Sequence, residues 1–267
     1  MTAVLATVRS ELTKAVTLRS TWLVVGAILV LNAVVIAIQL PLYLDAMAGV
    51  TPDGLVEVFP PVQQSVASLA AECATWPLQI GLLVFVVGAH LAGSDLGRDR
   101  LGVAVLAVPD RARLVGAKAL ATALVALVVG LLLLAPAVAA TYAVVRDWDP
   151  ALAWGAPALT GYARFLVFVV TTTLVGFALA LLGRRTLSGV LPCVVMLGLT
   201  LSQAVAAVAP GLDALLPTSA ARNLLVLPDP TLPPLTSGTG YATAVLVGWA
   251  VVAVAASAWS LHRRDAR

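Results

Sequence analysis

Hydrophobic residues in this 267-residue chain gather into long blocks, and polar residues mark the boundaries between them. An α-helix rises 1.5 Å per residue, so about 20 apolar residues cross a hydrocarbon core of roughly 30 Å. The blocks therefore predict six transmembrane helices. The third is longer than a bilayer requires and should tilt or project into the cytoplasm. The six predicted spans lie near residues 22–39, 76–92, 115–144, 164–182, 188–207 and 241–261.

Residues 3–20 have a different, amphipathic pattern. Leu5, Val8 and Leu12 fall on one side of a helix, and polar residues fall on the other. A short basic helix of this kind beside a span is typical of the membrane interface. The apolar block that follows is longer than the core of a secretory signal, and no clear cleavage site closes it. We therefore expect an uncleaved interfacial helix within residues 1–20.

Two further short helices are predicted on the outer side. Residues 62–73 have one apolar face and could continue into the second span. Residues 219–227 could form a helix with Ser219 as its N-cap. About nine residues cannot cross a bilayer, so this helix should be re-entrant or interfacial.

Composition decides the class of protein. The chain is 61% hydrophobic and only 11% charged, whereas a soluble domain carries about 25% charged residues. We expect one all-α membrane domain over residues 1–267. The net charge of +3 does not indicate a nucleic-acid partner, because the basic residues lie beside apolar segments. Cys73 and Cys193 lack the neighbours that a disulfide framework or metal site needs, so no metal site is predicted.

The distribution of charge predicts the topology. Placing both termini inside leaves only Arg146, Arg164 and Arg222 outside, and 13 of the 16 Lys and Arg residues inside. Short cytoplasmic loops are enriched in Lys and Arg, so both termini are expected to be cytoplasmic in a multi-pass protein.

Residues 93–118 are the most highly charged stretch and form the longest predicted inner loop. Leu101, Val105 and Val108 form an apolar ridge that is too short to span a bilayer but suits insertion into a partner's groove. We interpret this segment as a cytoplasmic coupling helix; an ordinary solvated loop with basic anchors remains the alternative. The charged residues are Asp95, Arg98, Asp99, Arg100, Asp110, Arg111, Arg113 and Lys118.

Several kinds of chemistry lack their motifs. The sequence has no phosphate-binding GxxxxGK[ST], no HExxH and no GxSxG,. The centres of the predicted spans carry no Asp, Glu, Lys or Arg, which argues against an ion-coupled carrier. Asn32 is strongly polar within the first span and could join helices or line a path.

The fifth predicted span carries a stripe of small residues. Gly198, Ser202 and Ala206 recur every four residues, which lets two helices approach closely,. Thr200 and Gln203 border the stripe and could make a partly polar path surface. Packing within one subunit and a subunit interface or pathway lining both remain open.

Four segments in order resemble the ABC-2 type permeases, the membrane subunits of bacterial ATP-binding-cassette exporters. RSELTKAVTLRSTW resembles the family's opening, and SDLGRDRLGVAVLAVPDRARLVGAK is similar to its loop between the second and third spans. LLPTSAARNLL and the closing RRDA resemble its last outer segment and its tail. Asp95 stands where the family usually has a glutamate, and Asp99-Arg100 stands where Gly-Thr is common.

This resemblance implies a function and a set of partners. The chain would be a permease in the plasma membrane, dimeric with a second copy or a paralogue, and not itself an enzyme. It would bind no cofactor, because ATP and magnesium would bind a separate cytoplasmic ATPase. Its substrate would be hydrophobic or amphiphilic and would leave between subunits, along the first, second and fifth spans. The residues implied in coupling are Asp95, Arg98, Arg100, Leu101, Val105, Val108, Pro109, Arg111, Arg113 and Lys118, with Glu11 and Lys14 of the N-terminal helix.

Two other functions share the same topology. A membrane scaffold or immunity protein would bind a ligand or partner without transport and without a nucleotide cycle. A stand-alone carrier would transport without any ATPase. The sequence does not identify a substrate.

Overall fold

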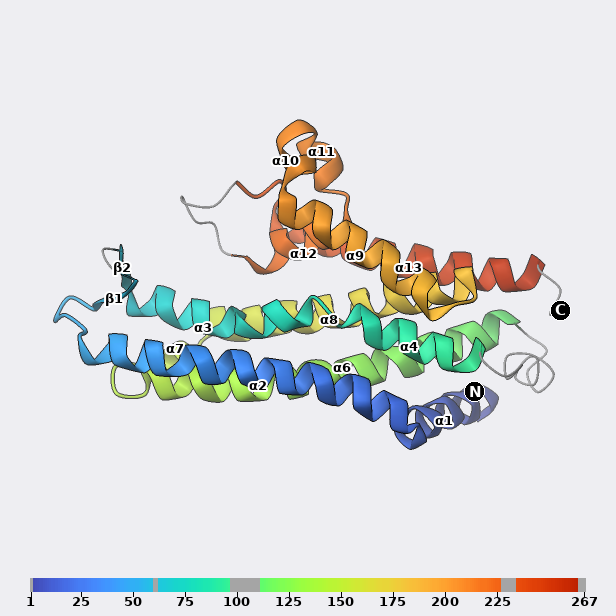
Figure 1. Ribbon diagram of the computed structural model, residues 1–267, viewed down its shortest axis with the longest axis horizontal. Coiled ribbons are helices and arrows are strands. Elements are labelled where there is room, and N and C mark those ends of the chain that lie inside the picture. Colours follow the sequence, from blue (N-terminus) through green and yellow to red (C-terminus); the bar gives the residue numbers. More distant parts are fainter. Residues whose placement is uncertain (1, 60–61, 97–110, 227–233, 264–267) are drawn as a thin grey trace.

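Long helices running along one axis make up most of the chain (Figure 1). The structure is a computed structural model that describes residues 2–59, 62–96, 111–226 and 234–263. The described elements are α1 (Thr2–Thr17), α2 (Arg19–Ala48), β1 (Leu55–Phe59), β2 (Val62–Ser65), α3 (Val66–Gly81), α4 (Phe85–Leu96), α6 (Arg111–Val145), α7 (Ala151–Trp154), α8 (Ala156–Gly183), α9 (Thr186–Ser202), α10 (Ala204–Val208), α11 (Pro210–Asp213), α12 (Pro217–Leu225) and α13 (Thr239–Arg263).

The expectation of an all-α membrane protein is confirmed at the level of class. Five helical segments in the described residues are long and apolar enough to cross a bilayer. They correspond to the first, second, third, fourth and sixth predicted spans. They are Arg19–Ala48, Val66–Ser94, Arg111–Val145, Ala151–Gly183 and Thr239–Arg263.

The fifth predicted span differs from the prediction of one helix over 188–207. Helix α9 ends at Ser202, because Gln203 adopts a left-handed backbone with φ of 56° and turns the chain into α10. Its 17 residues extend about 25 Å, short of a full hydrocarbon core,. Figure 1 shows α9 stopping well before the end of the bundle that α2 reaches.

The second predicted span is one apolar segment but two helices. Residues 82–84 interrupt it between α3 and α4. The segment also begins differently from the prediction of a helix over 62–73, because β2 occupies Val62–Ser65 and pairs antiparallel with β1. Helix α3 starts at Val66, where the Ser65 hydroxyl accepts a hydrogen bond from the Ser68 amide,.

Helix α8 lies at the centre of the bundle and contacts α4, α6, α9 and α13. Glycines allow its backbone to approach α4 and α9 closely. A Cβ atom on Gly88 would lie 1.9 Å from the Thr173 carbonyl oxygen, and one on Gly176 would lie 2.3 Å from the Phe85 carbonyl oxygen. Helices in a bilayer associate through such close packing, since lipid supplies no hydrophobic driving force between them.

The two ends of the bundle differ in charge. Both termini lie at one end, together with the end of α4 and the start of α6 (Figure 1). We call this the basic end and the opposite one the acidic end. The basic end carries Lys14, Arg111, Arg113, Lys118, Arg184, Arg185 and Arg263. The acidic end carries Asp45, Asp53, Glu57, Glu72, Asp147 and Asp149, with the cation Arg146.

Exposed aromatic residues indicate where the bilayer boundaries lie. Tyr241 lies near the beginning of α13 and Trp259 near its end, and both are exposed. Tyr241 and Trp259 are 18 residues apart on α13, which is about 27 Å of helix. This spacing matches the roughly 30 Å core between two interfacial aromatic belts.

The close crossing at Gly88 makes a prediction about stability. Gly88→Ala should lower the unfolding temperature of the detergent-solubilised protein, because overpacking costs about 1–3 kcal/mol. Helix propensity alone would favour alanine by about 1 kcal/mol. Gly116→Ala in α6 is the matched control, since its Cβ would meet nothing within 4 Å. Equal unfolding temperatures for the two variants would contradict the close crossing.

Candidate coupling junction at the basic end

Helix α1 lies against the beginning of α6 through a small apolar contact. Val8 is buried against Ala117 and Ala121 of α6, with Leu12 beside them. The two alanines bring α1 close to α6, because they present little side chain at the contact. This places the predicted interfacial helix on the third long helix.

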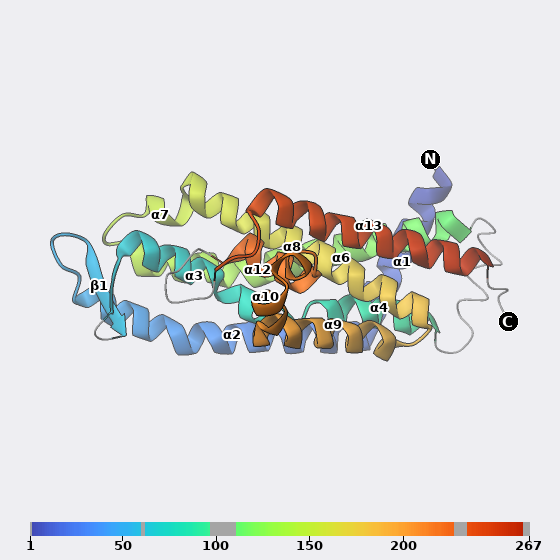
Figure 2. The same ribbon diagram turned by 90° about the horizontal axis from the view of Figure 1, so that it is seen from above.

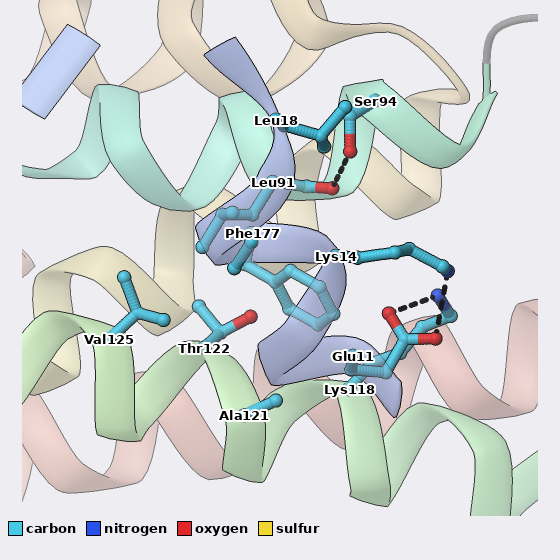
Figure 3. A pocket seen from close by; sticks show the side chains of 11 residues that line it. Glu11, Lys14, Leu18, Leu91, Ser94, Lys118, Ala121, Thr122, Val125 and Phe177 are labelled. Carbon is cyan, nitrogen blue, oxygen red and sulfur yellow. Dashed lines mark hydrogen bonds and ion pairs between the residues drawn. The ribbon is translucent and has the colours of Figure 1, made fainter. Parts of the chain in front are cut away.

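Two salt bridges centred on Glu11 fix the polar side of the same contact. The Lys118 ammonium donates to Oε2 of Glu11 at 2.9 Å, and the Lys14 ammonium donates to Oε1 at 2.9 Å (Figure 3). Only 3% of the Lys118 side chain and 13% of the Glu11 side chain are exposed. Breaking a salt bridge between deeply buried partners typically costs about 3–5 kcal/mol. Three residues expected in coupling therefore form one cluster.

Residues from four helices line a small cavity beside this cluster. Its volume is about 20 Å³, room for about one water molecule,. Leu91 and Ser94 of α4, Thr122 of α6 and Phe177 of α8 line it together with Leu18. Residues of α1, α4, α6 and α8 therefore meet around the Glu11–Lys118 contact.

The remaining predicted coupling residues divide into two groups. In α6, Arg111 donates from Nη1 to the Leu261 carbonyl oxygen at 2.6 Å and so caps the end of α13, while Arg113 is exposed,. Asp95 belongs to the last turn of α4. Arg98, Arg100, Leu101, Val105, Val108 and Pro109 lie outside the described residues.

Asn32 lies inside the chain rather than on its surface. It is 1% exposed, and its Nδ2 donates to the Leu133 carbonyl oxygen of α6 at 3.2 Å. The sequence left two roles open for Asn32, joining helices or lining a path. Its buried position favours a role in joining α2 to α6.

The small-residue stripe of α9 separates into two surfaces. Gly198 and Ser202 are exposed, and a Cβ on Gly198 would meet nothing within 4 Å. Thr200 is buried and hydrogen bonds to Ser219 at 2.9 Å on α12. Packing within the chain thus accounts for Thr200 but not for Gly198. Gln203 and Ala206 are half-buried near the end of the stripe.

A buried polar cluster around α11 and α12 was missed by the sequence reasoning. Asp213 is fully buried and accepts hydrogen bonds from Ser219 at 2.6 Å and Thr236 at 2.8 Å. Arg222 forms a salt bridge with the same carboxylate at 3.5 Å. An acid and an arginine nine residues apart in a proline-rich loop of an apolar chain were the available signal. The cluster ties α11, α12 and the segment before α13 together, and α12 contacts α8, α9 and α13.

These arrangements hold helices together through paired charges. In the described ranges, no group of three or more His, Cys, Asp or Glu residues is placed to hold a metal ion. No protein-family model matches the sequence, and no curated protein matches it closely enough to serve as a relative. The functional interpretation therefore depends on the residues and their geometry.

The Glu11 salt bridges make a prediction about α1. Glu11→Gln should raise the rate of trypsin cleavage after Arg9 at least about tenfold, because it removes the two salt bridges that hold α1 against α6,.

Two controls separate this effect from a general loss of fold. Replacing both partners by apolar residues (Glu11→Leu with Lys118→Met) should restore much of the protection. Glu57→Gln, at an exposed acid of β1, should leave the cleavage rate unchanged. Unchanged cleavage in the Glu11→Gln variant would contradict docking through this pair.

Proposed function

We propose that this chain is the membrane-spanning permease subunit of an ABC exporter. It moves a hydrophobic or amphiphilic substrate with energy from ATP hydrolysed by a separate cytoplasmic ATPase. The basic end faces the cytoplasm of a bacterial cell, and both termini lie there. The observation that carries the proposal is the docking of α1 on α6 through the buried Glu11–Lys118 pair.

The junction suits transmission of force into the membrane. Helix α6 has 35 residues and runs about 52 Å, from the basic end to the acidic end,. Lys118 lies near its beginning, and the predicted coupling segment joins α4 directly to α6. A push on that segment or on α1 would reach the same buried cluster. Rigid helices with few arrangements transmit such displacements well.

One face of the bundle supports a dimer. Helices α2 and α9 lie along the same edge in Figure 2, with α3 and α4 between them in Figure 1. Only 22% of the most apolar 18-residue stretch of α2 is buried within the chain. On α9, Gly198 and Ser202 are exposed. Small exposed residues allow another helix to approach closely. A second permease copy or a paralogue at this face would enclose the substrate path between the two subunits.

The absence of a phosphate-binding motif in the sequence assigns ATP hydrolysis to a partner. ATP and magnesium bind that ATPase subunit, and this chain contributes no catalytic residue. A scaffold or immunity protein would need neither the partner's hydrolysis nor the junction, so dependence on a catalytically intact ATPase distinguishes the functions.

The test is co-purification from native membranes. The intact chain should retain a P-loop ATPase in a near-stoichiometric amount. Leu101→Asp with Val105→Asp should lower that amount at least about tenfold, because two charges disrupt an apolar docking ridge. Leu55→Asp with Val62→Asp is the matched control, since both residues are exposed at the acidic end. Retention of the ATPase by the first double variant, or no P-loop ATPase with the intact chain, would contradict the proposal.

A further inference from the structure

A second candidate site lies at the acidic end, away from the α2–α9 face. A cavity of about 380 Å³ opens between α3, α7, α8 and α12. Ligand pockets for small molecules have volumes of about 300–1,000 Å³. Most of its lining is apolar, including Ala74, Leu78, Phe165 and Leu224. Space of this shape and chemistry suits a hydrocarbon chain.

One cation also lines the cavity. Arg164 is half-buried and forms no hydrogen bond or ion pair with any residue in the described ranges. It precedes the end of α8 at Gly183 by 19 residues, which is about 29 Å of helix. Arg164 therefore lies about one hydrocarbon thickness along α8 from the basic end of that helix. A guanidinium held there without a protein partner is positioned to pair with an anion.

Asp149 is the other charged residue of the lining. Its Oδ1 accepts a hydrogen bond from the Ala151 amide at 3.0 Å, at the start of α7. Among the described residues, its carboxylate forms no salt bridge with Arg164. The carboxylate thus helps to hold the rim of the cavity, and the guanidinium remains available.

We propose that this cavity binds an anionic amphiphile. The apolar chain lies among α3, α8 and α12, and the phosphate or carboxylate head group pairs with the guanidinium of Arg164. The amphiphile comes either from the lipid of the adjacent leaflet or from a soluble pool. This binding requires no ATPase, so it stands apart from the transport proposal.

Native mass spectrometry of the intact chain in a neutral detergent tests the site. The probes are phosphatidylglycerol and dodecyl phosphate, each compared with an uncharged counterpart, phosphatidylcholine and dodecanol. The anionic member of at least one pair should bind at least about tenfold more tightly, as expected for a charge-assisted contact. Preference for phosphatidylglycerol alone identifies a membrane lipid, and preference for dodecyl phosphate identifies a free amphiphile.

Two pairs of variants locate the bound molecule. Arg164→Gln should abolish the preference for the anion, whereas Arg146→Gln, at a 60% exposed residue of the same end, should retain it. Gly161→Leu should lower binding of the preferred probe at least about fivefold, since Gly161 lines the cavity and a Cβ there meets nothing within 4 Å,. Gly248→Leu on α13 is the matched control, because its Cβ position is equally open.

Folding of every variant is checked by gel filtration and by its unfolding temperature. No preference for either anionic probe, or a preference that survives Arg164→Gln in a folded protein, would overturn the proposal. Unchanged binding in the Gly161→Leu variant would overturn it as well.

Discussion

The arrangement of the bundle depends on the close approach of α8 to α4 and α9. Lipid chains are as apolar as leucine, so burying leucine between helices gains little in a bilayer. Contact between backbones gains more, because dispersion forces act over many atoms at short range. Gly88, Gly176 and Gly189 provide that contact, since a side chain at each would collide with a neighbouring backbone atom. The other helices then assemble around α8.

Polar clusters complete the structure where helices leave the apolar zone. Glu11 and Lys118 join α1 to α6 at the basic end, and Asp213 joins α11 to the segments around α12. Both clusters contain a deeply buried charge with an opposite charge beside it, as low polarity requires. The central part of the bundle needs only small residues and a few hydrogen bonds, such as that from Asn32 to Leu133. In the proposed coupling, force would enter the bundle where Glu11 and Lys118 hold α1 against α6.

Much of this could be predicted from periodicity alone. Continuous apolar blocks predict spans because their length must match the bilayer, and α2, α6, α8 and α13 follow that rule. The interruptions between α3 and α4 and at the end of α9 could not be predicted in the same way. Residues 82–84 are all apolar, and the Thr173 hydroxyl, which lies 3.4 Å from the Val84 carbonyl oxygen, belongs to a helix 89 residues further along. Glutamine seldom adopts a left-handed backbone conformation. The sequence around Gln203 therefore did not indicate that α9 ends there.

At the candidate junction, too, the sequence predicted some features and not others. Glu11 and Lys118 could each be selected from the sequence as charges beside apolar segments. Their pairing spans 107 positions and depends on how α1 folds back onto α6. Arg111 was expected to contact a partner, yet its guanidinium caps α13, because the end of that helix presents carbonyl oxygens nearby,. The Asp213 cluster could not be predicted because its partners come from two separate segments, α12 and the stretch before α13.

The account depends most on which end of the bundle faces the cytoplasm. Cysteine labelling with a membrane-impermeant maleimide measures this directly, in a chain whose buried Cys73 and Cys193 are replaced by alanine. Asp53→Cys reports the acidic end and Arg185→Cys the basic end, and both residues are exposed. Intact cells should label only Asp53→Cys, and Arg185→Cys should react only after permeabilisation. Labelling of Arg185→Cys in intact cells would place the basic end outside and contradict the coupling role.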